Sequence, residues 1–290
     1  MEYSRDKLRN LKNSCWGIGL SDIRNKMNFM ISGTGFAIDS EGFILTASHV
    51  IKELDKQREK LRKENIECAV SAFQVTMPEK QGHPLILKRG LVERRHIKIT
   101  PTEKHPLPSD YDVVVCRMAG KYDLKDYLKI KKPCKLELFE EILCCGFPGG
   151  SMGVFNIEDL ESGLRLSPAV QSGKISSVMP IDDVINPTGI ITDIVGIGGS
   201  SGSPIVNSND NEVIGIAQKV IPTEILKNGK SIGEAKIGLI LGISNYVLSK
   251  SIDKIIPLMK NELDENGKLK QEFAQKYSSD NTEKFTMDMS

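Results

Sequence analysis

The sequence predicts an all-β protein built as an antiparallel sandwich or barrel. Short apolar runs such as "YDVVVCRM", "EVIGIAQKV" and "IGLILGIS" recur along most of the chain. Turn-forming residues separate these runs at intervals of about eight to twelve positions, which is typical of antiparallel β-folds. The segment Asp39-Ser40-Glu41-Gly42 is a hairpin signal between two strand-like runs. These observations favour many short strands joined by tight turns.

The predicted elements follow in order along the chain. Residues 4–13 form a short charged helix, and strand-like runs extend from "SCWGIGL" to "SEGFILTASHVI". The stretch "KELDKQREKLRKENIE" then predicts a charged helix inserted at about residues 50–66. Further strand-like runs lie between "CAVSAFQVTM" and "IGLILGIS". The apolar positions of "NYVLSKSIDKIIPLMKNEL" have helical spacing, and the tail after them is polar and expected to be mostly mobile.

Composition argues against several classes of function. Among 290 residues, Lys plus Arg number 39 and Asp plus Glu 38, so no overall field attracts nucleic acid or acidic membranes. No run approaches the ~18 apolar residues of a membrane span, and the first residues lack a signal-peptide pattern. None of the six cysteines forms a CxxC pair, so we expect reduced thiols, a cytoplasmic location, no metal site and no cofactor. No aromatics interleave with the basic residues Lys88, Arg89, Arg94 and Arg95, which argues against nucleic-acid binding.

Three motifs carry the parts of an acyl-transfer site. Residues 198–204, "GGSSGSP", place three serines on a glycine-rich turn, and "TASHV" places His49 where a strand ends and a helix begins. "SDYDVVV" places Asp112 at the entrance of a buried strand. Such chemistry needs a serine, a base, a group that orients the base and two N–H groups for the oxyanion. Asp110 competes for the orienting role, and Asp112 is favoured because it directly precedes the buried valines.

At these motifs the sequence resembles the trypsin-like serine proteases, most closely their HtrA (Deg) branch. The resemblance runs from about Cys15 to Asp253 and rests on "GTGFAIDSEGFILTASHV", "DVVVCRM", "CCGFPGG", "VQSGKISSV" and "ITDIVGIGGSSGSPIVNSNDNEVIGI". The order His, Asp, Ser is also that of chymotrypsin-type enzymes. The resemblance implies two six-stranded antiparallel β-barrels of the chymotrypsin-like fold. Because only about 40 residues follow the last predicted strand, we expect no PDZ domain after the barrels. The expected parts are a polar segment at 1–13, the first barrel with the charged helix at 14–130, the second barrel at 131–248, and a helix and tail at 249–290.

The resemblance implies a serine endopeptidase that acts on proteins or peptides. Ser201 would be the nucleophile, His49 the general base and Asp112 the carboxylate that orients it, while the N–H groups of Gly199 and Ser201 would form the oxyanion hole. Ser200 occupies the position where digestive relatives hold a buried aspartate, so their zymogen activation is not implied.

The resemblance also suggests how a substrate would bind. Val195, six positions before the nucleophile, and Gly196 would form the base of the pocket for the residue before the scissile bond. Because no carboxylate is present there, we expect cleavage after small or medium aliphatic residues. The substrate backbone would pair as an added strand with residues in "IAQKV", namely Ile216, Ala217 and Gln218.

Several alternatives stay open on the sequence alone. Ser200 and Ser203 are interpreted as turn residues, although a shift of one position would make Ser200 the nucleophile. The charged run Lys52–Glu64 is interpreted as a solvated helix, with a docking arm for a regulatory protein as the alternative. The whole chain could also be an inactive or partner-gated module that binds peptides within a larger intracellular stress or defence system. In that case the N–H of Gly199 would be turned away from the substrate.

Overall fold

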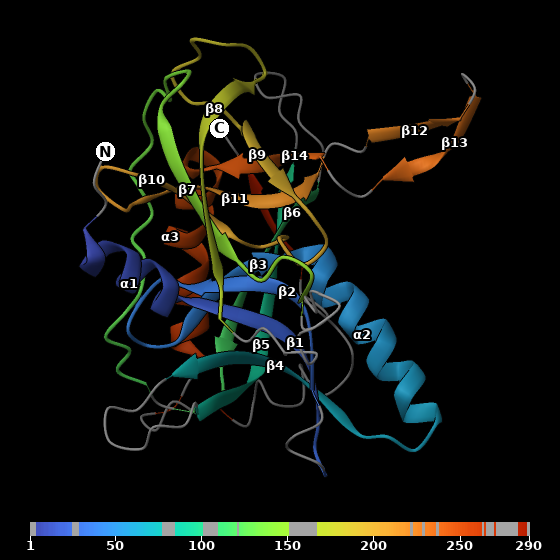
Figure 1. Ribbon diagram of the computed structural model, residues 1–290. Helices are drawn as coiled ribbons and strands as arrows, with labels where there is room; N and C mark the ends of the chain where they lie inside the picture. The colour runs from blue at the N-terminus through green and yellow to red at the C-terminus, as the bar shows by residue number, and fades with distance from the viewer. Residues whose placement is uncertain are drawn as a thin grey trace.

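Two closed, six-stranded antiparallel β-barrels make up most of the chain, which confirms the predicted fold class. The computed structural model describes residues 4–24, 29–76, 85–100, 110–120, 122–150, 167–220, 223–227, 230–235, 238–262, 264, 270 and 284–288. In Figure 1 one barrel lies above the other, with helix α3 beside them and helix α2 projecting outward.

The first barrel closes because its longest strand pairs with two neighbours in succession. The first part of β5 pairs with β4, and its later part pairs with β6. The order around the barrel is β5-β4-β1-β2-β3-β6. Its strands are β1 (Cys15–Asp22), β2 (Phe29–Ala37), β3 (Phe43–Ala47), β4 (Cys68–Thr76), β5 (Leu85–Thr100) and β6 (Asp110–Met118).

The second barrel closes through the pairing of β10 with β7. Its interior holds branched apolar side chains that include Ile142, Ile175, Ile190 and Ile205. The strands are β7 (Glu141–Gly146), β8 (Ala169–Met179), β9 (Gly189–Gly196), β10 (Pro204–Asn207), β11 (Val213–Val220) and β14 (Gly238–Ser244). Between β11 and β14 the chain forms a hairpin of β12 (Thr223–Lys227) and β13 (Lys230–Ala235), which extends away from the barrel (Figure 1).

Strands β3 and β6 contribute to two hydrophobic cores at once, because successive side chains of a strand point to opposite faces. Phe43 and Leu45 pack in a core shared with the second barrel and α3. Ile44 packs in a separate core with Val50 and Leu54 of α2. Every residue of β3 is therefore buried, and the site-bearing end of this strand is held on both faces.

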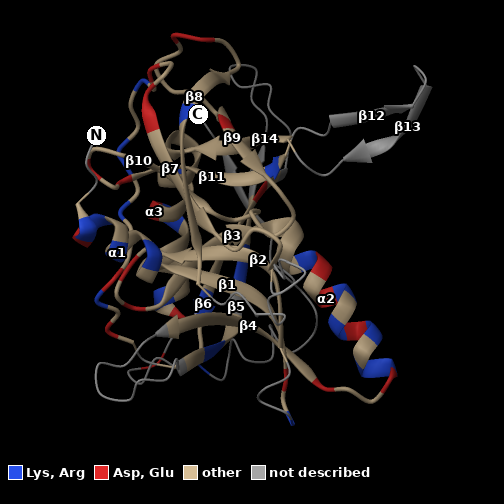
Figure 2. Cartoon of the chain, viewed as in Figure 1, with Lys and Arg blue, Asp and Glu red and all other residues tan. Residues whose placement is uncertain are grey.

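The three helices are α1 (Arg5–Ser14), α2 (Ser48–Lys63) and α3 (Asn245–Asn261). Positive and negative side chains alternate along α2 where it leaves the barrel (Figure 2). None of the described helices is long and apolar enough to cross a membrane.

Helix α3 begins four residues before the expected boundary at residue 249. In the polar tail after it, β15 (Lys284–Asp288) pairs in parallel with β5.

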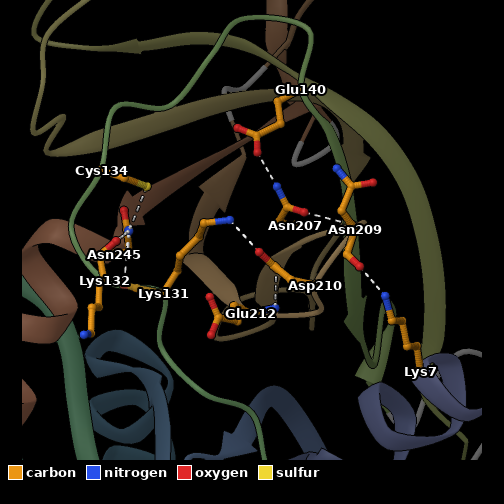
Figure 3. Close-up of polar contacts among 10 residues, drawn as sticks. All are labelled: Lys7, Lys131, Lys132, Cys134, Glu140, Asn207, Asn209, Asp210, Glu212 and Asn245. Carbon is orange, nitrogen blue, oxygen red and sulfur yellow. Dashed lines mark hydrogen bonds and ion pairs between the residues drawn. The ribbon is translucent and has the colours of Figure 1, made fainter.

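Polar contacts fasten the segment between the barrels to the second barrel (Figure 3). The Asn245 side chain, at the start of α3, donates to the carbonyl of Lys131 (3.2 Å) and to that of the next residue (2.9 Å). The ammonium of Lys131 pairs with Asp210 at 2.6 Å, in the turn between β10 and β11. Lys7 of α1 donates to the carbonyl of Asn209 in the same turn. Helix α3 is thereby attached to the connection between the barrels, and α1 is attached to the β10–β11 turn with which that connection forms its ion pair.

The six cysteines are free thiols. Burial raises the pKa of Cys144 to about 12 and raises the pKa of Cys15 well above its ordinary value. A thiol that stays protonated is a poor nucleophile, so these two side chains act as small apolar groups in the core.

A buried ion pair joins the first barrel to the end of α3. Arg95 of β5 donates through Nη2 to Oε1 of Glu262 at 2.6 Å, and both residues are less than one-tenth exposed. Charges buried in this way depend on each other, because removing one partner takes away an ion pair that offsets the cost of burying the other.

We expect Glu262→Leu to lower the free energy of unfolding by about 3–5 kcal/mol, since it leaves the Arg95 guanidinium buried without this carboxylate. The double variant Arg95→Met/Glu262→Leu should recover most of the loss, because an apolar pair then replaces the ion pair. Urea unfolding followed by circular dichroism measures both. A double variant as unstable as Glu262→Leu alone would show that the loss has another cause.

Candidate active site

His49 lies where β3 gives way to α2. The helix begins at Ser48, directly after Ala47 at the end of β3, so His49 is the second helical residue. Pairing of β3 with β2 on one side and β6 on the other fixes the direction in which the chain enters the helix. The imidazole itself is about half exposed, at 48%. This matches the predicted position at a strand-to-helix junction.

Asp112 holds His49 through two hydrogen bonds. Its Oδ1 accepts the backbone N–H of His49 at 2.7 Å, and its Oδ2 is hydrogen-bonded to the ring Nδ1. Ala47 and Val113 are partners in the β3–β6 ladder, which brings the neighbouring Asp112 beside the histidine. A carboxylate that accepts the Nδ1 proton leaves Nε2 with its lone pair free to act as a base. The side chain of Asp110 lies outside the described residues.

The turn that carries Ser201 is attached to both barrels. Within the second barrel, the N–H of Gly202 donates to the Ala217 carbonyl (2.7 Å), and the N–H of Ala217 donates to the Ser203 carbonyl (2.9 Å). From the first barrel, the N–H of Thr34 donates to the Ser201 carbonyl at 2.9 Å. The backbone of the serine is thus fixed from opposite sides.

Two glycines in this turn combine a left-handed backbone with close approach. Gly199 has φ +89° and Gly202 has φ +85°. A Cβ on Gly199 would lie 2.3 Å from the Phe147 carbonyl oxygen, and one on Gly202 would lie 2.0 Å from that of Thr34. No L side chain fits either position without movement of the backbone. The density of small residues in "GGSSGSP" therefore reflects both a sharp bend and tight packing.

Thr34 is a site residue that the motif comparison did not single out. Its hydroxyl donates to the Gly199 carbonyl at 2.9 Å and accepts the N–H of Phe147 at 2.9 Å. The residue is fully buried. The signal available in the sequence was a hydroxyl residue between two glycines in an apolar run, "SGTGFA".

The turn around Ser201 presents two backbone N–H groups, those of Gly199 and Ser201, for which the described residues provide no acceptor. The Gly198 carbonyl accepts the N–H of Gly149 at 2.5 Å. Because the C=O and N–H of a trans peptide point to opposite sides, the N–H of Gly199 points away from Gly149. Over the described part of the chain, neither this N–H nor that of Ser201 donates to an acceptor.

The Ser201 hydroxyl donates to the Gln218 carbonyl at 2.9 Å. No hydrogen bond joins Ser201 to His49, both of which are described, although both line a single cavity of about 740 Å³. Ser200 also lines this cavity but is only 5% exposed, and its oxygen faces the N–H of Ile197 at 3.5 Å. Ser203 is buried and does not line the cavity.

The cavity lies between the barrels, and its walls on the side of the second barrel are mostly apolar, with Lys219 as the charged residue there. Ile197, Val220, Ile240 and Leu241 line that side. The first barrel contributes His49 together with residues of β2 and α2, among them the carboxylate of Glu53.

Part of the predicted specificity pocket lies elsewhere. Val195 is 51% exposed and does not line the cavity, and neither does Gly196. A Cβ on Gly196 would meet Val220 at 2.6 Å, so this glycine packs behind the wall while Ile197 supplies the wall itself.

The predicted substrate-pairing segment is placed partly as expected. Ala217 and Gln218 line the cavity, but the side chain of Ile216 is buried in the core between the barrels. Gln218 lies at an irregularity between Ala217 and Lys219 and has no partner in the ladder with β14. Its backbone groups are therefore not used by that ladder.

A second histidine lies directly behind the junction that carries His49. His96 of β5 is 7% exposed, and its Nδ1 lies 2.7 Å from the hydroxyl of Ser48. Burial, together with the nearby cations Lys52 and Arg94, lowers the pKa of His96 to about 4. The ring is therefore neutral near pH 7.

Known proteins provide three comparisons. The family of the trypsin-like peptidase domain matches residues 33–216. No curated protein sequence matches the chain. Among solved structures, the MamO protease domain from Magnetospirillum magneticum (apo form) aligns with a TM-score of 0.48 and 13% identity, over 84% of this chain and 97% of that one. The HtrA-type protease AlgW with tripeptide aligns with a TM-score of 0.46 and 16% identity, over 87% of this chain and 62% of that chain, less than two thirds of its length.

Protonation of His96 should destabilise the fold in acid. Its folded-state pKa of about 4 lies below the ordinary value of 6.5, so the unfolded chain binds the proton more readily. Stability present near pH 7 is therefore lost as the pH falls from about 6.5 toward 4, by on the order of 3 kcal/mol. Urea unfolding from pH 7 to pH 4 should show a shallower pH dependence for His96→Gln than for the wild type. Equal slopes would contradict this assignment.

Proposed function

Since the chain belongs to the family of the trypsin-like peptidase domain, we propose that it is a serine endopeptidase that acts through Ser201, His49 and Asp112. The observation that carries this proposal is the pairing of His49 with Asp112 on the cavity that Ser201 also lines. Each residue stands on a different element, so the arrangement requires the full fold.

In the proposed reaction, the Ser201 hydroxyl leaves the Gln218 carbonyl and turns toward Nε2 of His49. The imidazole takes the proton as Oγ attacks the peptide carbonyl, and Asp112 stabilises the resulting imidazolium. The N–H groups of Gly199 and Ser201 bind the oxyanion. His49 then protonates the leaving amine, and water hydrolyses the acyl-enzyme with His49 again as the base.

We propose that the cavity accepts a small or medium aliphatic side chain before the scissile bond. Its walls on the second barrel are mostly apolar, and its carboxylate, Glu53, belongs to α2 on the opposite side. An extended peptide would pair with the backbone at Gln218, whose groups β14 leaves unused. The substrate would in this way replace the resting hydrogen bond of the Ser201 hydroxyl.

A partner-gated module is the second candidate, and one observation favours it. The Ser201 hydroxyl is bonded to the Gln218 carbonyl instead of His49. A regulatory partner that shifts this carbonyl would release the nucleophile. Incubating the isolated protein with denatured casein distinguishes the two candidate functions. Cleavage of the casein supports a free-standing protease, and no cleavage by a correctly folded protein supports a partner-gated module.

Ser201→Ala should abolish labelling by a fluorophosphonate probe and lower peptidase activity by roughly 10⁴- to 10⁶-fold, because the attacking oxygen is lost. Ser200→Ala should still be labelled. Gel fluorescence of the labelled proteins measures both. Labelling that persists in Ser201→Ala but disappears in Ser200→Ala would move the nucleophile by one residue.

Cleavage of a peptide library should show a preference for Val, Ala, Ile or Leu before the scissile bond, and a clear preference for Arg or Lys would refute the proposed pocket. Val220→Phe should narrow the cavity and lower kcat/KM for Leu relative to Ala by about 10- to 200-fold. Val92→Phe is the matched control, because Val92 is exposed on β5 and does not line the cavity.

A further inference from the structure

A second cavity, of about 590 Å³, lies beside α1 and away from the candidate active site. Arg9 and Lys12 of α1 line it together with Lys125 of the segment between the barrels. Arg9 and Lys12 are three positions apart, so they lie on the same face of the helix. Its size is within the range of cavities that hold small organic ligands.

The positive charge of this cavity is only partly balanced. Asp126 is the one carboxylate among its described lining residues. That carboxylate accepts hydrogen bonds from the amides of Asn10 (3.3 Å) and Asn13 (3.0 Å) and not from a cation. Arg9, Lys12 and Lys125 form no ion pair within the described parts of the chain. Three cations and one carboxylate leave an excess of positive charge.

Trp16 adds an independent indication of a missing acceptor. It lines the same cavity, is only 3% exposed, and its indole N–H has no hydrogen-bond partner among the described residues. The indole N–H donates and cannot accept, so only an acceptor satisfies it. A buried donor without a partner is costly to a fold, and the indole ring that carries this donor forms part of the cavity wall.

We propose that this cavity binds a small organic phosphate. A phosphate group offers several acceptor oxygens and about two negative charges, which suits the three cations Arg9, Lys12 and Lys125 better than a single carboxylate does. The volume exceeds that of the phosphate group, and Val75, Leu124 and Pro168 provide an apolar surface for the body of the ligand. The expected ligand is of nucleoside monophosphate size.

The single tryptophan of the chain makes binding measurable at the site itself. The Ser201→Ala protein is titrated with adenosine 5′-monophosphate, inorganic phosphate and adenosine, and Trp16 fluorescence is recorded. We expect a saturable change with the monophosphate, a weaker one with inorganic phosphate, and none with adenosine. Because the nucleophile is absent from this protein, the result does not depend on the proposed protease activity.

Charge reversal provides the matched comparison. Lys12→Glu should weaken monophosphate binding at least about tenfold, since it removes one charge-assisted contact and adds repulsion. Arg5→Glu, an equal charge change on the same helix outside the cavity, should leave binding unchanged. The proposal is overturned if no phosphate binds, if adenosine binds as tightly, if Lys12→Glu binds like the wild type, or if an acidic peptide binds and the monophosphate does not.

Discussion

Thr34 joins the two barrels at the point where the candidate site is formed. Its backbone N–H holds the Ser201 carbonyl, and its hydroxyl connects the Gly199 carbonyl to the N–H of Phe147. These bonds are buried, where water cannot compete for the donors and where an unmade bond is costly. The nucleophile turn belongs to the second barrel, but a strand of the first barrel determines where it lies. The direction of the Gly199 N–H is fixed in the same way, because the carbonyls on both sides of it accept hydrogen bonds from Gly149 and Thr34.

The remaining geometry follows from the way β3 and β6 are packed. Alternate side chains of β3 enter two separate cores, so the strand has no face on which it is free to shift. The His49 junction extends from this strand, and Asp112 precedes the valines of its neighbour. The position of the candidate base is therefore a product of core packing, to which Asp112 adds one hydrogen bond to the backbone of His49 and one that orients the ring. The close packing of β3 in the interior thus fixes the position of His49, although the imidazole itself is half exposed.

The sequence was a good guide to the fold because alternating apolar residues and turn signals are local properties. His49 and Asp112 were located for the same reason, since each borders a strongly apolar run. The residues that line the cavity were harder to predict from the sequence. The choice between Val195 and Ile197 depends on where β9 stops pairing and the turn begins. The role of Thr34 was also not visible, because its partners lie more than 110 positions away along the chain. The ion pairs of Arg94 with Asp55 and of Arg95 with Glu262 were not visible either, because these carboxylates lie on α2 and directly after α3.

Helix α2 is attached to the first barrel near its middle as well as at the end that carries His49. It is 16 residues long, hence about 24 Å, and carries His49 at one end and exposed charges at the other. Arg94 of β5 donates hydrogen bonds to both carboxylate oxygens of Asp55, at 2.7 Å and 2.8 Å, and Asp55 lies in the first half of this helix. This ion pair ties the middle of α2 to the first barrel, between His49 and the exposed charges. The half of α2 that carries the imidazole is therefore held by the barrel independently of the exposed end.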